Sequence, residues 1–262
     1  MIPLTEIKEK ARFYGVPAST IERDYTQNWL LASFTLMNMA LKGGTGIRKV
    51  HIQKYRFSDD LDFTLIETQK PEEILQKIHH AVEKVKERCG ISFSDEIKIK
   101  ETKSGFRGTV YFKIIPTGSP TSIGIHLDIT DPSNEEIILP ILQKEIFHEY
   151  SDGLKSEISS YSIDEIMSEK LRSLFQRTRA RDLYDVYMIS SLVDIDLVKE
   201  TFLKKCENKN VYPDFNNFIL KQDKFQSTWK SSLEHQIKSL PDFELVFTGV
   251  SDILKGIEFN NF

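Results

Sequence analysis

Two acidic residues stand two positions apart in a run with β-strand alternation, and their spacing suggests metal-dependent chemistry. Asp60 and Asp62 alternate with apolar residues across residues 56–65. Side chains on a strand alternate between its two faces, so both carboxylates are expected on one face. Their mutual repulsion is costly without a cation, and Mg²⁺ prefers oxygen ligands. We therefore predict that Asp60 and Asp62 bind Mg²⁺, or Mn²⁺ in its place.

A third carboxylate lies in a second alternating run, residues 123–129. There Asp128 shares the polar face with Gly124 and His126, while the other face is apolar. Carboxylates from neighbouring strands can hold two metal ions about 3.5–4 Å apart, an arrangement suited to phosphoryl transfer. We expect Asp128 to be a metal ligand that helps deprotonate an acceptor hydroxyl. Asp60 and Asp62 would hold the metal that bridges a nucleoside triphosphate.

A glycine bend precedes the acidic strand. Lys42, Gly43, Gly44 and Thr45 are followed, after a short helix, by Ser58 and the acidic pair. A glycine turn lets backbone N–H groups approach a phosphate, and a following helix adds a favourable dipole. These five residues are therefore candidates for nucleotide binding, with the hydroxyl of Thr45 donating to phosphate. Each feature alone is more often a plain turn or a solvated face, whereas their conjunction favours function.

A second set of candidates falls in helical sequence. Ser162 and Glu165 stand three apart, as in a capping box that needs no further function. Lys170 lies near an apolar stripe and is expected to contact the triphosphate, oriented by Asp182 or Asp185. Asp182 and Asp185 are candidate catalytic carboxylates, and Arg181 is a candidate nucleotide contact. The alternative is a set of ordinary helix-surface ion pairs.

The surrounding pattern predicts an α+β protein with a mixed sheet followed by a helical bundle. Helical spacing covers residues 21–39 and 71–88, and a hairpin is expected to join strands at 109–115 and 123–129 across residues 116–120. The β-signal largely stops after residues 151–153. We expect two domains, 1–155 and 156–262.

Composition limits the classes of protein that the chain can be. It has 262 residues, a formal net charge of −4 and 40% hydrophobic residues, which suits a globular protein. A polyanion could bind only through a local basic patch. The most apolar stretch, 29–41, is too short to span a bilayer, and the two cysteines have no metal-site spacing. A cytoplasmic protein without membrane contact is expected.

Three of these motifs resemble those of the AbiEii/AbiGii-type nucleotidyltransferase toxins. Residues 41–45 together with 56–63 resemble the first motif of that family. The third motif is similar to Ser162-x-x-Glu165-x-x-x-x-Lys170, and the fourth is similar to Arg181-Asp182-x-x-Asp185. The helix around Asp24 also looks family-like, so the resemblance covers about residues 20–190. Ser162 replaces the usual Thr, and Gly46 follows the bend where a better helix former is common.

The resemblance implies a polymerase-β-like nucleotidyltransferase domain, a nucleoside triphosphate substrate with Mg²⁺, and a toxin that acts beside a separately encoded antitoxin. Some members transfer nucleotides to the 3′ end of tRNA, so RNA is the expected acceptor. Lys113, on the polar face of its strand, is a further expected phosphate contact. The expected acceptor patch comprises Arg172, Arg177, Arg179, Arg181, Lys199, Lys204 and Lys205. A small-molecule or protein acceptor, or a catalytically silent binding module, are the alternatives.

Overall fold

The computed structural model describes residues 1–34, 37–114 and 122–257, and the chain divides into two compact units. The first unit comprises Met1–Ile137 with Ile141–Tyr161, and the second comprises Ile138–Pro140 with the chain from Ser162 onward. Whether they are separate domains, as expected for 1–155 and 156–262, stays a prediction.

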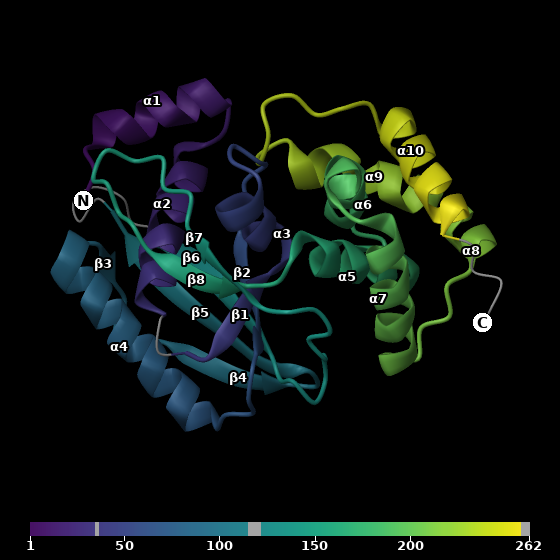
Figure 1. Cartoon of the computed structure of the whole chain (residues 1–262). Coiled ribbons are helices and arrows are strands. Elements are labelled where there is room, and N and C mark those ends of the chain that lie inside the picture. The colour runs from purple at the N-terminus through teal and green to yellow at the C-terminus, as the bar shows by residue number, and fades with distance from the viewer. Residues whose placement is uncertain (35–36, 115–121, 258–262) are drawn as a thin grey trace. The chain divides into compact units, whose positions relative to one another are not determined.

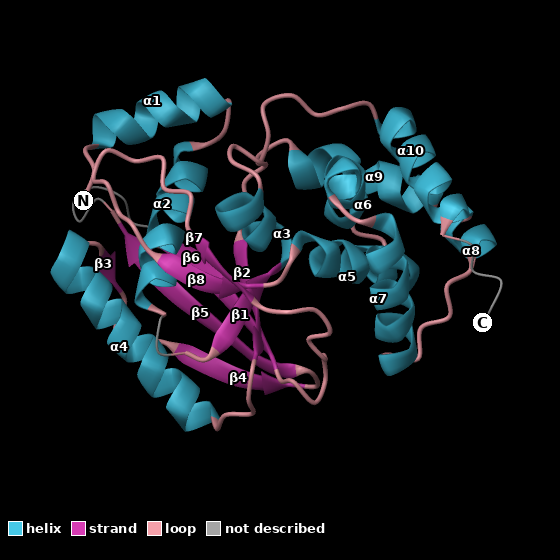
Figure 2. Cartoon of the chain, viewed as in Figure 1, coloured by secondary structure: helices cyan, strands magenta, loops and turns pink. Residues whose placement is uncertain are grey.

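The first unit is built on a mixed eight-stranded sheet (Figure 2). Its central order is β7-β8-β1-β2-β6-β5, and β3 and β4 both pair with the outer edge of β5. The β1–β8 and β2–β6 pairs are parallel and the others are antiparallel. The strands are β1 Met39–Lys42, β2 Asp60–Leu65, β3 Ser92–Phe93, β4 Lys98–Thr102, β5 Gly105–Lys113, β6 Ile123–Thr130, β7 Leu142–Glu145 and β8 Glu157–Ser160. The expected mixed sheet is confirmed.

Helices cover the apolar face of this sheet (Figure 1). They are α2 Ala18–Ser33 and α4 Pro71–Cys89. Helix α1 Leu4–Tyr14 packs against α2, and α3 Gly43–Gly46 and the π-helical turn η1 Ile47–His51 follow β1. Apolar residues at alternate strand positions, such as Leu61, Phe63 and Leu127, join the helices in one buried cluster. The same alternation leaves the polar strand residues on the opposite face.

Several element boundaries differ from the sequence prediction because strand pairing overrides local preference. The helix expected over 21–39 ends at Ser33, and Met39 already belongs to β1, which pairs with β2 and β8. The strand expected from residue 56 begins at Asp60, and β8 continues the sheet beyond residue 153. β5 and β6 pair antiparallel as expected, while the turn predicted over 116–120 lies outside the described residues.

The second unit is helical throughout its described length after Ser162. Its helices are α5 Ile163–Gln176, α6 Ala180–Ile189, the 3-10 turn η2 Ser190–Leu192, α7 Ile195–Asn208, α8 Phe215–Ile219, α9 Gln222–Leu233 and α10 Phe243–Gly256. Ser162 caps α5 by accepting from the N–H of Glu165. The Glu165 carboxylate instead accepts from the N–H groups of Ile138 and Leu139, so only half of the expected capping box forms. No helix in the described parts of the chain has the length and apolarity needed to cross a membrane.

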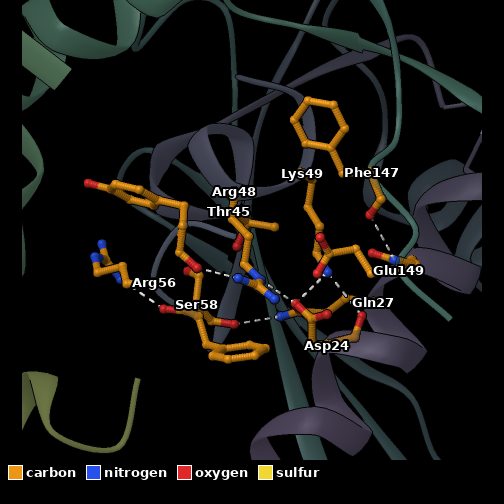
Figure 3. Close-up of polar contacts among 12 residues, drawn as sticks. Asp24, Gln27, Thr45, Arg48, Lys49, Arg56, Ser58, Phe147 and Glu149 are labelled. Carbon is orange, nitrogen blue, oxygen red and sulfur yellow. Dashed lines mark hydrogen bonds and ion pairs between the residues drawn. The ribbon is translucent and has the colours of Figure 1, made fainter. Parts of the chain in front are cut away.

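A buried charge cluster ties α2 to the turn η1 (Figure 3). Asp24 Oδ1 lies 2.6 Å from both Arg48 Nε and Lys49 Nζ, and the hydroxyl of Tyr150 donates to Asp24 Oδ2 at 2.8 Å. Burial by itself raises the pKa of Asp24, but the two cations outweigh it and hold that pKa well below its ordinary value. The cluster therefore fixes the segment that directly follows the glycine bend.

Replacing Asp24 with Asn should lower the free energy of unfolding by about 3–5 kcal/mol, because Arg48 and Lys49 would remain buried without their counter-charge. Urea unfolding measures this loss. Asp95→Asn is the control, since the side chain of Asp95 is fully exposed at 101% and its loss should leave stability unchanged. Equal stabilities of the two variants would contradict the anchoring role.

Candidate active site

A row of charged residues crosses five neighbouring strands on the polar face of the sheet. Strand register pairs Lys42 with Asp62, Asp62 with Asp128, Asp128 with Arg107, and Arg107 with Lys100. Directly paired residues share a face, on neighbouring strands about 4.7–4.9 Å apart. Asp62 and Asp128 therefore stand side by side between cationic residues at either end of the row. Asp60 occupies the next position on the same face of β2.

The glycine bend packs directly against this row. Gly43 has φ +66°, and a Cβ built on it would lie 2.5 Å from Asp62 Oδ2. A Cβ on Gly44 would lie 3.2 Å from the Ser58 hydroxyl oxygen and 2.8 Å from Arg56 Nη2. Only glycine permits this approach, because any side chain would displace the carboxylate. The bend expected to receive phosphate thus contacts the acidic strand.

Two side-chain hydrogen bonds hold the bend and the acidic strand in place. The hydroxyl of the buried Thr45 donates to the backbone carbonyl of Asp60. The side chain of Gln27, on α2, donates to the carbonyl of Ser58 at 3.0 Å (Figure 3). In this structure Thr45 positions the start of β2, and its expected contact with phosphate stays a prediction.

Arg107 is a member of the site that sequence reasoning missed. Its Nε lies 2.5 Å from Asp128 Oδ1, and its Nη2 lies 3.3 Å from Oδ2. The hydrogen bond and the charge of Asp128 raise the pKa of Arg107, and the charges of Asp60 and Asp62 add to the effect. The strand predicted from the sequence began at residue 109, whereas β5 begins at Gly105, and only the register with β6 gives Arg107 its partner Asp128.

The acidic residues match a divalent cation in donor type, but they are not gathered around one point. Within the described parts of the chain, no three His, Cys, Asp or Glu side chains are grouped closely enough to hold a metal ion. Carboxylate oxygens are the donors that Mg²⁺ prefers, and Asp60 and Asp62 share one face. Asp128 is engaged by Arg107 instead. A three-carboxylate centre would require release of that ion pair.

Lys113 lies apart from the charged row. It follows Arg107 by six residues on the same strand, which corresponds to about 20 Å at 3.3–3.4 Å per residue. The side chain shares the polar face, but this distance separates it from the triphosphate position expected beside Asp62. The strand alternation correctly placed Lys113 on the polar face, but it could not give the distance between Lys113 and the charged row.

The helical candidates form their own buried cluster in the second unit. Lys170 Nζ lies 2.7 Å from Asp182 Oδ1 and 2.8 Å from Asp185 Oδ2, and Arg177 Nε lies 2.8 Å from Asp182 Oδ2. Burial opposes ionisation of Asp182, but Lys170 and Arg177 outweigh it and depress its pKa. Arg181, half-buried, precedes Asp182 on α6. That this cluster and the sheet carboxylates meet one nucleotide stays a prediction.

Part of the expected basic patch is not available to an acceptor. Arg172 is buried, and Lys205 is 1% exposed with its Nζ 2.8 Å from Glu165 Oε1. Arg177, Arg179 and Lys204 are exposed. Helical spacing cannot distinguish a buried ion pair from a solvated one, so the sequence assigned both kinds to one surface.

Solved structures share the fold of this chain. MenT4, a nucleotidyltransferase toxin from Mycobacterium tuberculosis H37Rv, superposes with a TM-score of 0.65 at 18% identity, over 98% of this chain and 90% of that one. JHP933 from Helicobacter pylori superposes with a TM-score of 0.61 at 18% identity, over 92% and 93%. The expected nucleotidyltransferase fold is confirmed. No curated protein sequence is similar enough to count as a match.

The family follows from the sequence match. Residues 28–252 match the family described as "Nucleotidyl transferase AbiEii toxin, Type IV TA system". The chain belongs to this family and is a nucleotidyltransferase, as its motifs predicted. The match extends beyond residue 190, into helices where the sequence showed no recognisable motif.

Replacing Gly43 with Ala should destabilise the protein more than the same change at Gly153. Both glycines have nearly the same φ, +66° and +65°, but a Cβ on Gly153 meets nothing within 4 Å. The backbone penalty of about 1–2 kcal/mol is therefore shared, and the collision with Asp62 should add about 1–3 kcal/mol at Gly43 alone. Chemical denaturation of both variants measures the difference, and equal losses would contradict the close approach.

Asp182→Asn should make stability less sensitive to acid. The folded-state pKa of Asp182 lies below its ordinary value of 3.8, so its contribution is present above that pH and is lost as the pH falls through the folded-state pKa. The variant should be about 3–5 kcal/mol less stable at pH 7. Urea unfolding from pH 7 to pH 2 should show the gap between the proteins narrowing below about pH 4; a constant gap would contradict the assignment.

Proposed function

We propose that this chain is a Mg²⁺-dependent enzyme that transfers a nucleotide from a nucleoside triphosphate to the 3′ end of an RNA, with tRNA as the expected acceptor. The observation that carries the proposal is the contact between the glycine bend and the Asp62 carboxylate. It joins a backbone suited to phosphate with side chains suited to a divalent cation. Membership of the nucleotidyltransferase toxin family supports the same reaction.

The proposed reaction forms one phosphorus–oxygen bond and breaks another. The acceptor hydroxyl oxygen bonds to the α-phosphorus, the bond from that phosphorus to the bridging oxygen breaks, and pyrophosphate leaves. Bound Mg²⁺ would neutralise the charge that develops on the phosphate oxygens. Asp60 and Asp62 would hold the cation, and Asp128 would accept the proton of the acceptor hydroxyl. Lys42 and the backbone N–H groups of the bend would orient the phosphates.

We assign the Lys170 cluster a supporting role in the same reaction. Its ammonium, fixed between Asp182 and Asp185, would contact the triphosphate, while the two carboxylates orient it. Because two carboxylates already hold the Lys170 side chain, it would lose little further conformational entropy on binding phosphate, and this favours binding. Arg181 would lie beside it as a further phosphate contact.

The exposed side chains of the polar face favour a nucleic-acid acceptor over a small cationic molecule. Arg107 and Tyr111 stand on the same face of β5, and their side chains are exposed, Tyr111 at 45%. The ring of Tyr111 lies against Gly124, where an added Cβ would stand 3.3 Å away. An exposed aromatic ring can stack on an unpaired base, and an arginine four residues along the strand, about 13 Å away, can contact the phosphate of another nucleotide of the same strand. We further propose a cytoplasmic toxin that acts beside a separately encoded antitoxin.

Transfer of labelled nucleotide to total tRNA tests this proposal. The protein is incubated with Mg²⁺ and each labelled triphosphate in turn, and product is resolved on a gel. Asp62→Asn should lower transfer by about 100-fold or more, because it removes a ligand charge from the metal site. Asp95→Asn, an exposed carboxylate change in the same unit, should leave transfer unchanged.

Two outcomes would overturn the proposed reaction, and a third would reject only its RNA acceptor. If wild type and Asp62→Asn transfer nucleotide equally well, the acidic strand does not hold the catalytic metal. If no triphosphate gives transfer to RNA, to aminoglycosides or to protein, the chain is not the proposed enzyme. Transfer to an aminoglycoside or a protein, but not to RNA, would keep the reaction and reject the RNA acceptor.

A further inference from the structure

We propose that Arg107 competes with the divalent cation for Asp128, holding this carboxylate while no metal is bound and releasing it when a cation binds. Arg107 would then be a positioning residue that sets the cation concentration at which the site assembles. This inference rests on the proposed function, because it assumes that Asp60, Asp62 and Asp128 form the metal centre.

The geometry of the ion pair carries the proposal. Arg107 contacts both oxygens of Asp128, through Nε at 2.5 Å and through Nη2 at 3.3 Å. A two-point contact of this kind fixes the orientation of the carboxylate and also balances its negative charge. The oxygens that a metal would need are therefore engaged, and Asp128 does not join a metal-binding group among the described residues.

The charge balance of the row explains why a competitor is present there. Asp62 and Asp128 are paired in register, and Asp60 is two residues from Asp62, so three carboxylates lie on one face of two neighbouring strands. Without a cation they repel one another. Lys42 flanks the row on the Asp62 side, with its Nζ 5.5 Å from the centre of the Tyr161 ring. Arg107 supplies the positive charge on the Asp128 side.

The exposure of Arg107 allows it to leave. Its side chain is 61% exposed and that of Asp128 is 34% exposed, so the pair can open into solvent without disturbing the core. An exposed ion pair contributes little to stability, which keeps the competition weak enough for a divalent cation to win. A buried guanidinium, such as that of Arg48 beside Asp24, could not yield in this way.

The proposal predicts that removing Arg107 tightens cation binding. Arg107→Ala should bind Mg²⁺ about three- to tenfold more tightly than wild type, because the ion pair no longer opposes binding and one nearby positive charge is gone. Arg107→Lys keeps the charge and loses the two-point contact, so it should fall between the two. Lys100→Ala removes an equal charge one strand further away and should change affinity less.

Calorimetric titration of the full-length, metal-free protein with MgCl₂ at constant ionic strength tests the prediction. Thermal unfolding with and without Mg²⁺ gives a second reading, in which the Mg²⁺-induced rise in Tm should be larger for Arg107→Ala than for wild type. In an Asp128→Asn background, Arg107→Ala should lose most of its effect on affinity, since the contact it relieves is already gone. A residue with only a structural role would lower Tm and leave Mg²⁺ affinity unchanged.

The outcomes separate this inference from the proposed function. If wild type binds Mg²⁺ saturably, Asp62→Asn abolishes binding and Arg107→Ala binds no more tightly than Lys100→Ala, the inference is wrong and the metal centre stands. If neither wild type nor Arg107→Ala binds Mg²⁺ saturably, alone or with a nucleoside triphosphate, both the metal centre and the inference are rejected.

Discussion

The site depends on the absence of a side chain at Gly43. The chain leaves β1 with a positive φ at this residue, and the Asp62 carboxylate occupies the space that a Cβ would fill. The same approach places Gly44 against Ser58. Everything proposed for the reaction requires that backbone N–H groups and acidic oxygens stand within the reach of one triphosphate. The two glycines meet that requirement because they let two segments of backbone come closer than side chains allow.

That close approach needs rigid support, and the first unit supplies it through buried polar contacts. Asp24 fixes Arg48 and Lys49 directly after the bend, Gln27 holds the segment before β2, and the hydroxyl of Thr45 joins the bend to Asp60. Two of these three anchors come from α2, which also packs on the apolar face of the sheet. One helix thus links the hydrophobic core to the geometry of the site.

Clustered acidic groups dominate the electrostatics of both units, and each unit balances them with cations. In the sheet, buried Lys42 stands beside Asp62, while Arg107 pairs with Asp128 at the surface, where ion pairs are weak and can exchange. In the helices, Lys170 is held between Asp182 and Asp185 in a buried site, where loss of one partner is costly. The exposed Arg107–Asp128 pair can therefore open when a ligand binds, whereas the buried Lys170 cluster is expected to stay fixed.

The sequence by itself identified the family and predicted which acidic residues would bind a metal. The two-residue alternation assigned Asp60, Asp62 and Asp128 to polar strand faces, and the spacing of the motifs identified a nucleotidyltransferase. Both patterns can be read from the sequence because they involve residues that are close together along the chain. Only the tertiary structure decided which strands are neighbours. Pairing of β2 with β6 and of β6 with β5 placed Asp128 between Asp62 and Arg107 and put Lys113 far along β5 from that row. Packing among the helices of the second unit buried Arg172 and Lys205. These outcomes depend on register and packing between distant segments, which no local pattern encodes.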